Sequence, residues 1–308
     1  MIAFVFPGQG SQYVGMGKEL YDEFSIAKET FQEANDTLGF DLSGLCFEGE
    51  QSELSLTANA QPALLTTSIA CLRVLQNETD FSADFVAGHS LGEYSALVAN
   101  GAIKLSDGVH TVRKRGEFMQ EAVPVGMGAM AAVLGLEKEQ VENICDQVSK
   151  NGMIASPANL NAPGQIVISG NKEAIEQAAE IAKSEGAKRV VPLDVSAPFH
   201  CALMKPAADK LSEVLDQIDV GEMSASLVAN CTASVTNDSS KVKELLISQV
   251  TSPVRWFESV SVLKQEGCDN FIEIGPKNVL SGLIKRTLSD VTVNNFEKIS
   301  QLESMKNA

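Results

Sequence analysis

The stretch Gly88-His89-Ser90-Leu91-Gly92 constrains the fold of this chain more than any other. The apolar run Phe85-Val86-Ala87 leads into it, and Ser95-Ala96-Leu97-Val98 follows with the composition of a helix. A strand, a sharp turn and a helix around Gly-x-Ser-x-Gly are typical of a nucleophile elbow, which holds a serine hydroxyl above a sheet on strained backbone. We therefore predict that Ser90 is a nucleophile that becomes acylated.

The motif needs support from the rest of the chain. A glycine-flanked serine in an ordinary turn between a strand and a helix has the same pattern. With glycine and serine each at about 7% of residues, the pattern arises by chance in roughly one chain in ten of this size. The interpretation of Ser90 therefore depends on a base and a substrate-binding group elsewhere in the sequence.

Composition limits the class of protein. The 308 residues are 44% hydrophobic and 21% charged, as in globular proteins, and are enough for one large domain with a smaller companion. No apolar run has the length of a membrane span, and the segment Met1–Pro7 lacks the basic residues of a signal peptide. We expect a cytoplasmic protein that does not use a membrane.

Charge and cysteine content exclude further classes. The net charge of −16 argues against nucleic acid as a partner. The six cysteines are scattered without a Cys-x-x-Cys pair, and the chain has three histidines, so we expect neither disulfides nor a zinc site. We predict no bound metal.

Strands and helical segments alternate in the first and last parts of the chain. This order is typical of a mainly parallel sheet covered by helices. Strands are expected at 2–6, 85–87, 227–230, 270–274 and 291–296, and helices at 17–24, 25–38, 60–75, 106–122, 207–215, 240–250, 256–266 and 279–286.

The segment 126–195 has a different pattern. Strands at 128–135, 153–159, 165–170 and 188–193, with helices at 137–149 and 172–185, give the order βαββαβ. This is the order of a ferredoxin-like unit. We therefore predict an α/β fold: a large α/β-hydrolase-like domain of residues 1–124 and 196–308 with a mainly parallel sheet, and an inserted ferredoxin-like subdomain of residues 125–195.

The helix expected at 106–122 places Arg115 at the edge of its apolar face, near Met119. An inward arginine needs an anionic partner, because an unpaired buried charge is destabilising by several kcal/mol. The partner is either a carboxylate of the protein or a carboxylate of a substrate, and the pattern leaves both open. His110 falls on the polar face of the same helix.

A nucleophilic serine needs a base, and histidine is the usual one. His89 is adjacent to Ser90 and is expected to point away from the hydroxyl, and His110 is expected at the surface. His200 remains as the predicted base, although a histidine satisfied by backbone at a helix start is an alternative.

The order of residues indicates a dyad rather than a triad. No Asp or Glu stands out between Ser90 and His200, and the chain continues far beyond His200, unlike the Ser, acid, His order of α/β-hydrolases. We therefore predict a Ser–His pair whose histidine is oriented by a backbone or amide carbonyl.

Five motifs stand in one order along the chain, and together they are far more specific than Gly-x-Ser-x-Gly. They are Pro7-Gly8-Gln9-Gly10-Ser11-Gln12, Gly88 to Tyr94, Arg115-Gly116, Ser196-Ala197-Pro198-Phe199-His200 and Glu273-Ile274-Gly275-Pro276. In these motifs the chain resembles the malonyl-CoA:acyl carrier protein transacylases, acyltransferases of fatty-acid synthesis. The resemblance covers nearly the full chain, including the inserted subdomain.

The resemblance implies a role for each matching residue. Ser90 is the acylated nucleophile, His200 is the base, and Arg115 binds the malonyl carboxylate. The backbone N–H groups of Gln9 and Leu91 form the oxyanion hole.

Further matches concern specificity and partners. Gln249 matches the family glutamine whose carbonyl orients the histidine. Phe199 resembles the aromatic residue that disfavours an α-methyl branch in related polyketide acyltransferases, although an aromatic that fills a void is the alternative. The resemblance implies malonyl-CoA as substrate, acyl carrier protein as acceptor, no cofactor and a monomer.

Two other functions are alternatives to malonyl transfer. A serine thioesterase or esterase would employ Ser90 and His200 without needing the charge of Arg115. A non-catalytic scaffold that binds acyl carrier protein would employ none of them. We expect malonyl transfer to distinguish the three.

Overall fold

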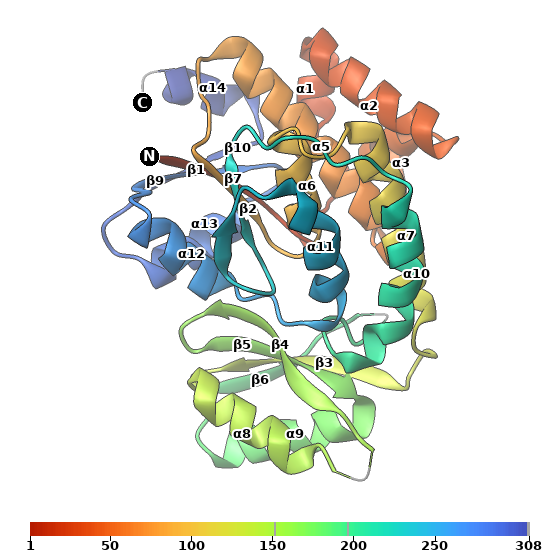
Figure 1. Cartoon of the computed structure of the whole chain (residues 1–308), viewed down its shortest axis with the longest axis vertical. Coiled ribbons are helices and arrows are strands. Elements are labelled where there is room, and N and C mark those ends of the chain that lie inside the picture. The colour runs from red at the N-terminus through yellow and green to blue at the C-terminus, as the bar shows by residue number, and fades with distance from the viewer. Residues whose placement is uncertain (151, 196, 307–308) are drawn as a thin grey trace.

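The computed structural model describes residues 1–150, 152–195 and 197–306. It has a larger part built on a six-stranded sheet and a smaller part built on a four-stranded sheet (Figure 1). The smaller part lies at one end of the long axis, and its two helices pack on the side of its sheet that faces away from the larger part (Figure 1).

The large sheet has the strand order β10-β9-β1-β2-β7-β8. All of its pairs are parallel except the last, β7 with β8. The strands are β1 (Ile2–Phe6), β2 (Phe85–Gly88), β7 (Ser226–Ala229), β8 (Ser234–Thr236), β9 (Asn270–Ile274) and β10 (Thr292–Phe296). The predicted mainly parallel sheet is confirmed, and β8 is an addition that the sequence pattern did not indicate.

Both faces of the central strand β1 are buried. Phe4 and Phe6 pack into one apolar cluster, and Ala3 and Val5 pack into a second cluster on the opposite face. Side chains alternate between the faces of a strand, so a continuous apolar run is what a strand covered by helices on both sides requires.

Helices cover both faces of this sheet (Figure 1). They are α1 (Lys18–Glu23), α2 (Ser25–Leu38), α3 (Leu42–Glu48), α4 (Gln51–Leu54), α5 (Thr57–Glu78), α6 (Leu91–Ala99), α7 (Leu105–Glu121), α10 (Lys205–Asp216), α11 (Val242–Thr251), α12 (Trp256–Gln265), α13 (Val279–Thr287) and α14 (Ile299–Lys306). The short 3-10 helices η1 (Ala202–Met204) and η2 (Ser239–Lys241) precede α10 and α11.

Helix α5 begins one turn earlier than the sequence pattern indicates, so Pro62 lies inside the helix rather than in its first turn. A proline has no N–H to donate to the carbonyl four residues earlier, which is that of Ala58. The Nη1 of Arg113 donates to the Ala58 oxygen instead, at 3.0 Å. The proline is tolerated because an arginine from α7 replaces the missing backbone donor.

The small sheet has the order β4-β5-β3-β6, and all of its pairs are antiparallel. Its elements are β3 (Gly128–Leu134), α8 (Lys138–Val148), β4 (Ala155–Ala162), β5 (Gln165–Asn171), α9 (Lys172–Ser184) and β6 (Arg189–Pro192). They have a hydrophobic cluster of their own, in which Val133 and Ile168 of the sheet join Ile144 and Ala178 of the helices. The predicted α/β class with a βαββαβ unit is confirmed.

Strand β4 joins the two parts. Leu160 N donates to Val254 O and Val254 N donates to Ala158 O, each at 2.8 Å. Asn161 is also hydrogen-bonded to His89, next to the elbow, through its Oδ1 and the Nε2 of the histidine at 2.8 Å. The smaller part is therefore attached at a fixed place beside Ser90.

The exact division of the chain into a large domain and residues 125–195 stays a prediction. Ser196, which the predicted boundary and the fourth motif include, lies outside the described residues. None of the helices in the described ranges combines the length and the apolar character that a membrane crossing needs.

Candidate active site

The turn between β2 and α6 places Ser90 at the start of a helix. Ser90 has φ 53 and ψ −105, a backbone conformation that residues other than glycine rarely adopt. A Cβ at Gly88 would overlap the backbone of Gly92, and a Cβ at Gly92 would overlap the carbonyl of Phe6. The turn therefore requires both glycines of the motif, as expected for a nucleophile elbow.

Asn230 holds the strained turn in place. It follows β7 and is completely buried. Its Oδ1 accepts from Ser90 N at 2.7 Å, and its Nδ2 donates to Gly88 O at 2.6 Å. Asn230 is not among the site residues that the sequence predicts. A polar residue at the carboxyl end of a buried parallel strand, beside the elbow, is the signal that could have identified it.

His200 lies against the serine. Its Nε2 is 2.8 Å from Ser90 Oγ, and its Nδ1 is 2.9 Å from the main-chain oxygen of Gln249. A carbonyl only accepts hydrogen bonds, so Nδ1 carries the proton and Nε2 is free to accept from the hydroxyl. Burial, followed by the positive charge of Arg115, lowers the pKa of His200 to about 3.

The two other histidines lie elsewhere. His89 is bonded to Asn161, and burial lowers its pKa. His110 is exposed on α7. Of the three histidines, the structure therefore brings His200 to the serine hydroxyl, as the sequence analysis expected.

Arg115 is buried at the base of the site with 2% of its surface exposed. Its Nη2 donates to Ser90 Oγ at 3.0 Å and to Gln249 Oε1 at 2.9 Å, and its Nη1 donates to Gln61 Oε1 at 2.8 Å. The acceptors of these three bonds are uncharged oxygens, and the guanidinium also lies over the ring of Tyr94, 5.4 Å from its centroid. The carboxyl of Glu93 attracts the guanidinium electrostatically, but no ion pair joins the two side chains in the described residues. A buried cation whose hydrogen bonds go to neutral acceptors is suited to bind a further anion.

The hydrogen bonds around Ser90 have one direction. Arginine can only donate, so Ser90 Oγ accepts from Arg115, and the hydroxyl proton points at His200 Nε2. This arrangement is what removal of the proton by the histidine needs.

The loop that contains Gln9 runs past the elbow, since a Cβ added at Gly8 would overlap the carbonyl oxygen of His89. Gly10 N donates to Gln12 Oε1 at 2.7 Å, and Lys277 Nζ donates to Gly10 O at 3.0 Å. Leu91 N is at the first position of α6, where an N–H has no partner within its helix. The backbone N–H groups of Gln9 and Leu91 therefore stay candidates for an oxyanion hole.

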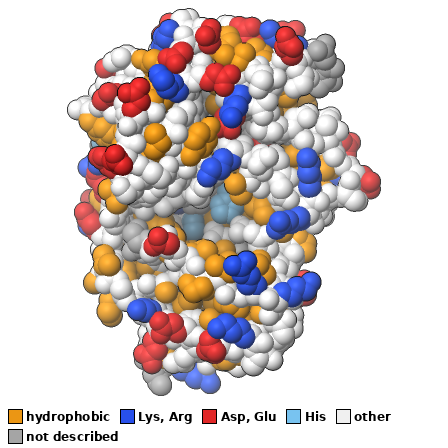
Figure 2. All heavy atoms as spheres, turned by 180° about the vertical axis from the view of Figure 1, so that it is seen from behind, with side chains coloured by type: hydrophobic (Ala, Val, Ile, Leu, Met, Phe, Trp, Pro, Cys, Tyr) orange, Lys and Arg blue, Asp and Glu red, His pale blue; other side chains and the backbone are white. Residues whose placement is uncertain are grey.

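A cleft of about 490 Å³ contains these groups. Its lining includes Gln9, Ser90, Arg115, Phe199 and His200 from the larger part, and Met130 and Leu193 from the segment of the smaller part. Figure 2 shows histidine side chains in a hollow near the middle of one face of the molecule. A concave site with apolar walls and a few converging polar groups is typical of a small-molecule site.

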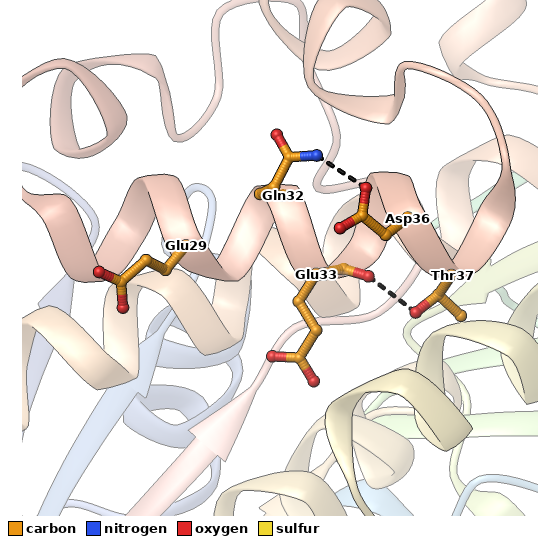
Figure 3. Close-up of a pocket in the computed structure, with 5 residues that line it drawn as sticks. All are labelled: Glu29, Gln32, Glu33, Asp36 and Thr37. Carbon is orange, nitrogen blue, oxygen red and sulfur yellow. Dashed lines mark hydrogen bonds between the residues drawn. The ribbon is translucent and has the colours of Figure 1, made fainter.

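A hollow of similar size on α2 differs in chemistry. It measures about 550 Å³ and is lined by Glu29, Gln32, Glu33, Asp36 and Thr37. Its side chains lie along one helix face, where Gln32 donates to Asp36 at 2.8 Å and Thr37 donates to Glu33 O at 2.7 Å (Figure 3). Its carboxylates lie on one outer helix face, and the lining holds no cation or serine to which they could be matched, so this acidic surface is not a candidate active site.

Two further buried residues of the site are not predicted by the sequence. Gln61 accepts from Arg115, and Glu93 accepts from Gln249 Nε2 at 2.8 Å and Asn230 N at 3.0 Å. Glu93 is an acidic residue in an otherwise apolar helix, which is a signal available in the sequence. The expectation that no Asp or Glu stands out between Ser90 and His200 did not take Glu93 into account. Among the described residues, Glu93 makes no hydrogen bond to His200.

A serine at a strand-to-helix turn, bonded to a buried neutral histidine beside a fixed cation, defines a class: enzymes that transfer acyl groups through a serine. A family model described as an acyl transferase domain matches residues 3–307. The malonyl CoA-acyl carrier protein transacylase of Bacillus subtilis (strain 168) is 56% identical over 301 residues, covering 97% of this chain and 95% of the relative.

Solved structures agree with this. An acyl carrier protein S-malonyltransferase from Vibrio cholerae superposes with a TM-score of 0.97 at 43% identity, covering 99% of each chain. A malonyl-transacylase solved in complex with its type II polyketide synthase acyl carrier protein has a TM-score of 0.96 at 44% identity, covering 99% of each chain. The chain belongs to the acyl transferase domain family, among the malonyl CoA-acyl carrier protein transacylases.

Proposed function

We propose that this protein transfers a malonyl group from malonyl-CoA to the phosphopantetheine thiol of acyl carrier protein, and so supplies fatty-acid synthesis. The observation that carries the proposal is the buried Arg115, whose Nη2 lies 3.0 Å from Ser90 Oγ. A cation at this distance from the nucleophile is suited to hold the carboxylate of a malonyl group whose thioester carbonyl faces the serine. The names of the relatives support the same substrates.

In the first half-reaction His200 Nε2 takes the proton of Ser90, and Oγ forms a bond to the thioester carbonyl carbon. The negative charge of the tetrahedral intermediate rests on the backbone N–H groups of Gln9 and Leu91. The bond to sulfur then breaks, and the coenzyme A thiolate takes the proton from His200. The product is malonyl-Ser90.

In the second half-reaction His200 removes the proton from the thiol of the carrier protein, and the sulfur attacks the same carbonyl carbon. Ser90 Oγ leaves and recovers the proton. The bond from Nδ1 to the Gln249 carbonyl keeps the imidazole in one tautomer through both halves. The reaction is of the ping-pong type and needs no metal or redox cofactor.

Selectivity follows from charge and shape. An acetyl group would leave Arg115 without an anion in a site where its guanidinium is buried, so malonyl is preferred. Phe199, which is 8% exposed and lines the cleft, disfavours an α-methyl branch by its bulk.

We further propose a monomer that acts in the cytoplasm, with residues 125–195 as the inserted subdomain. The monomer rests on analogy with the family. The subdomain is supported by the separate sheet and hydrophobic cluster of β3 to β6.

The decisive experiment is intact-mass measurement after the protein is mixed with malonyl-CoA. We expect one malonyl adduct on the wild type, none on Ser90→Ala, and loss of the adduct when acyl carrier protein is added. A wild type without an adduct, or an adduct that persists in Ser90→Ala, would contradict the proposal. Rapid release of free malonate without transfer would instead favour the thioesterase.

A further inference from the structure

Glu93 lies completely buried beneath the reacting serine, and the mechanism above gives it no part. It is in the first turn of α6, three residues after Ser90. Its Oε1 has no hydrogen-bond partner among the described residues, whereas its Oε2 has two. Burying a carboxylate is destabilising unless hydrogen bonds or an opposite charge compensate for the lost hydration.

The two donors on Oε2 come from different elements, and both hold Ser90. Asn230 N donates to Glu93 at 3.0 Å, while the Asn230 side chain accepts from Ser90 N at 2.7 Å. Gln249 Nε2 donates to Glu93 at 2.8 Å and to Ser90 O at 3.0 Å. One oxygen therefore links β7, α11 and the strained turn.

Glu93 also sets which way the amide of Gln249 faces. Because a carboxylate oxygen accepts, the Gln249 NH₂ turns toward Glu93, and Oε1 is left to accept from Arg115 at 2.9 Å. The reversed amide would point donors at a guanidinium that can only donate. The main-chain oxygen of the same glutamine holds His200 Nδ1.

We propose that Glu93 is a positioning residue that, through Gln249 and Asn230, aligns Arg115, His200 and Ser90 for acyl transfer without touching the substrate. The inference rests on the proposed function. Glu93 differs from the acid of a catalytic triad. His200 is bonded to the main-chain carbonyl of Gln249, and Glu93 is bonded to the side chain of that glutamine rather than to the histidine.

The test compares Glu93→Gln with Glu93→Asp. Glutamine keeps the side-chain length and an acceptor oxygen but removes the charge, whereas aspartate keeps the charge and is one methylene shorter. We expect malonylation of Ser90 within about threefold of wild type for Glu93→Gln, and a kcat about a hundredfold lower for Glu93→Asp, since small misplacement of reacting groups has effects of this size. The preference for malonyl-CoA over acetyl-CoA should fall in the aspartate variant and persist in the glutamine variant.

Glu273 provides a matched control. It is a buried glutamate of β9 that accepts from Leu280 N at 3.0 Å and Ser281 N at 2.7 Å, and it does not line the cleft. Glu273→Asp should lower the melting temperature as Glu93→Asp does, yet keep the wild-type kcat per folded molecule and the wild-type malonyl preference. A purely structural role of Glu93 would make the two aspartate variants alike.

Three outcomes overturn the inference: wild-type kcat and preference in folded Glu93→Asp, equal losses in Glu93→Gln and Glu93→Asp, or a loss of more than about tenfold in Glu93→Gln. The last applies also where Glu93→Asp does not fold. A wild type that forms no malonyl adduct in the same series contradicts the proposed function instead, so the two failures are distinguishable.

Discussion

Two residues that face each other in the site have backbone conformations that normally favour glycine: Ser90 with φ 53 and His200 with φ 59. Each such conformation is unfavourable by roughly 1–3 kcal/mol and persists only where the surroundings determine it. Asn230 bonds the backbone on the amino side of Ser90, and the Gln249 carbonyl bonds the ring of His200. These bonds hold the two residues in the conformations that place the hydroxyl 2.8 Å from the imidazole.

Arg115→Ala should separate malonyl transfer from simple acyl transfer. Without the guanidinium the malonyl carboxylate enters the site without a partner, and we expect kcat/KM for malonyl-CoA to fall about a hundredfold or more while acetyl-CoA is spared. Steady-state kinetics with both thioesters measure the change. Arg115→Lys is the control, because it keeps the charge but not the paired donors, and it should be intermediate. Normal malonyl transfer by Arg115→Ala would mean that Arg115 is not the carboxylate clamp.

The rate of malonyl-Ser90 formation should fall on the acidic side only below pH 6.5. His200 acts as a base only when neutral, and burial lowers its pKa to about 3, so the base stays neutral as the pH falls through the usual range of histidine. The rate of malonyl-Ser90 formation under single-turnover conditions measures this acidic limb of the pH profile. An inflection at or above pH 6.5 that belongs to His200 would show that the imidazole is not held neutral by its surroundings.

At the scale of elements, the elbow works because α6 packs directly on the end of β1. A Cβ at Gly92 would overlap the carbonyl of Phe6, so the glycine allows the helix to approach the strand. This close approach also brings the loop after β1 to the start of α6, since a Cβ at Gly92 would lie 3.1 Å from the carbonyl oxygen of Pro7. The two segments proposed for the oxyanion hole are adjacent for this reason.

Substitutions of two helical glycines should therefore have opposite effects. Gly92→Ala forces backbone atoms apart and should be destabilising by about 3 kcal/mol. Gly282→Ala lies in α13, where the space is open, and should be stabilising by roughly 0.5–1 kcal/mol. Denaturant unfolding measures both. Equal effects of the two changes would argue against a close approach of α6 and β1.

At the scale of the whole molecule, the cleft exists because a second folded unit is attached beside the elbow. Strand β4 forms an isolated parallel bridge, Asn159 with Val254, to the larger part, and its register is irregular at that place. Asn159 lines the cleft. The smaller part thus supplies a wall of the site as well as a core of its own.

Global stability should fall in acid partly because of His200. The pKa of His200 is lowered in the folded state and ordinary in the unfolded state, so the unfolded state binds more protons below pH 6.5. The contribution of the neutral imidazole to folding stability is therefore full above pH 6.5 and is lost as the pH falls toward 3. Relative to His200→Gln, the wild type should lose about 3 kcal/mol of unfolding free energy between pH 7 and pH 4.

The comparison with the variant is needed because Glu93 acts in the opposite direction. Burial raises its pKa to about 7, so its contribution to stability is full below pH 4.5 and is lost as the pH rises toward 7. This effect is present in both proteins and cancels in the difference. A difference in unfolding free energy that stays constant across this range would contradict the burial of a neutral His200.

The sequence by itself determined the class of fold, the βαββαβ order of elements, the elbow and the inward direction of Arg115, because each depends on local periodicity or on steric demands within a few residues. By elimination among three histidines it also predicted that His200 lies beside Ser90, where the structure places it. What partnered Arg115 was left open, and the structure answers with uncharged oxygens of Ser90, Gln61 and Gln249.

Only the tertiary structure determined the network of buried hydrogen bonds that holds the Ser90 turn. Asn230, Glu93 and Gln249 are far apart in the sequence, and nothing in their local patterns indicates that one carboxylate oxygen gathers the other two. Their meeting depends on how β7 and α11 pack against α6, and such packing is a property of the assembled core. The polar network exists because those elements bury it together, where each unpaired donor or acceptor would be unfavourable.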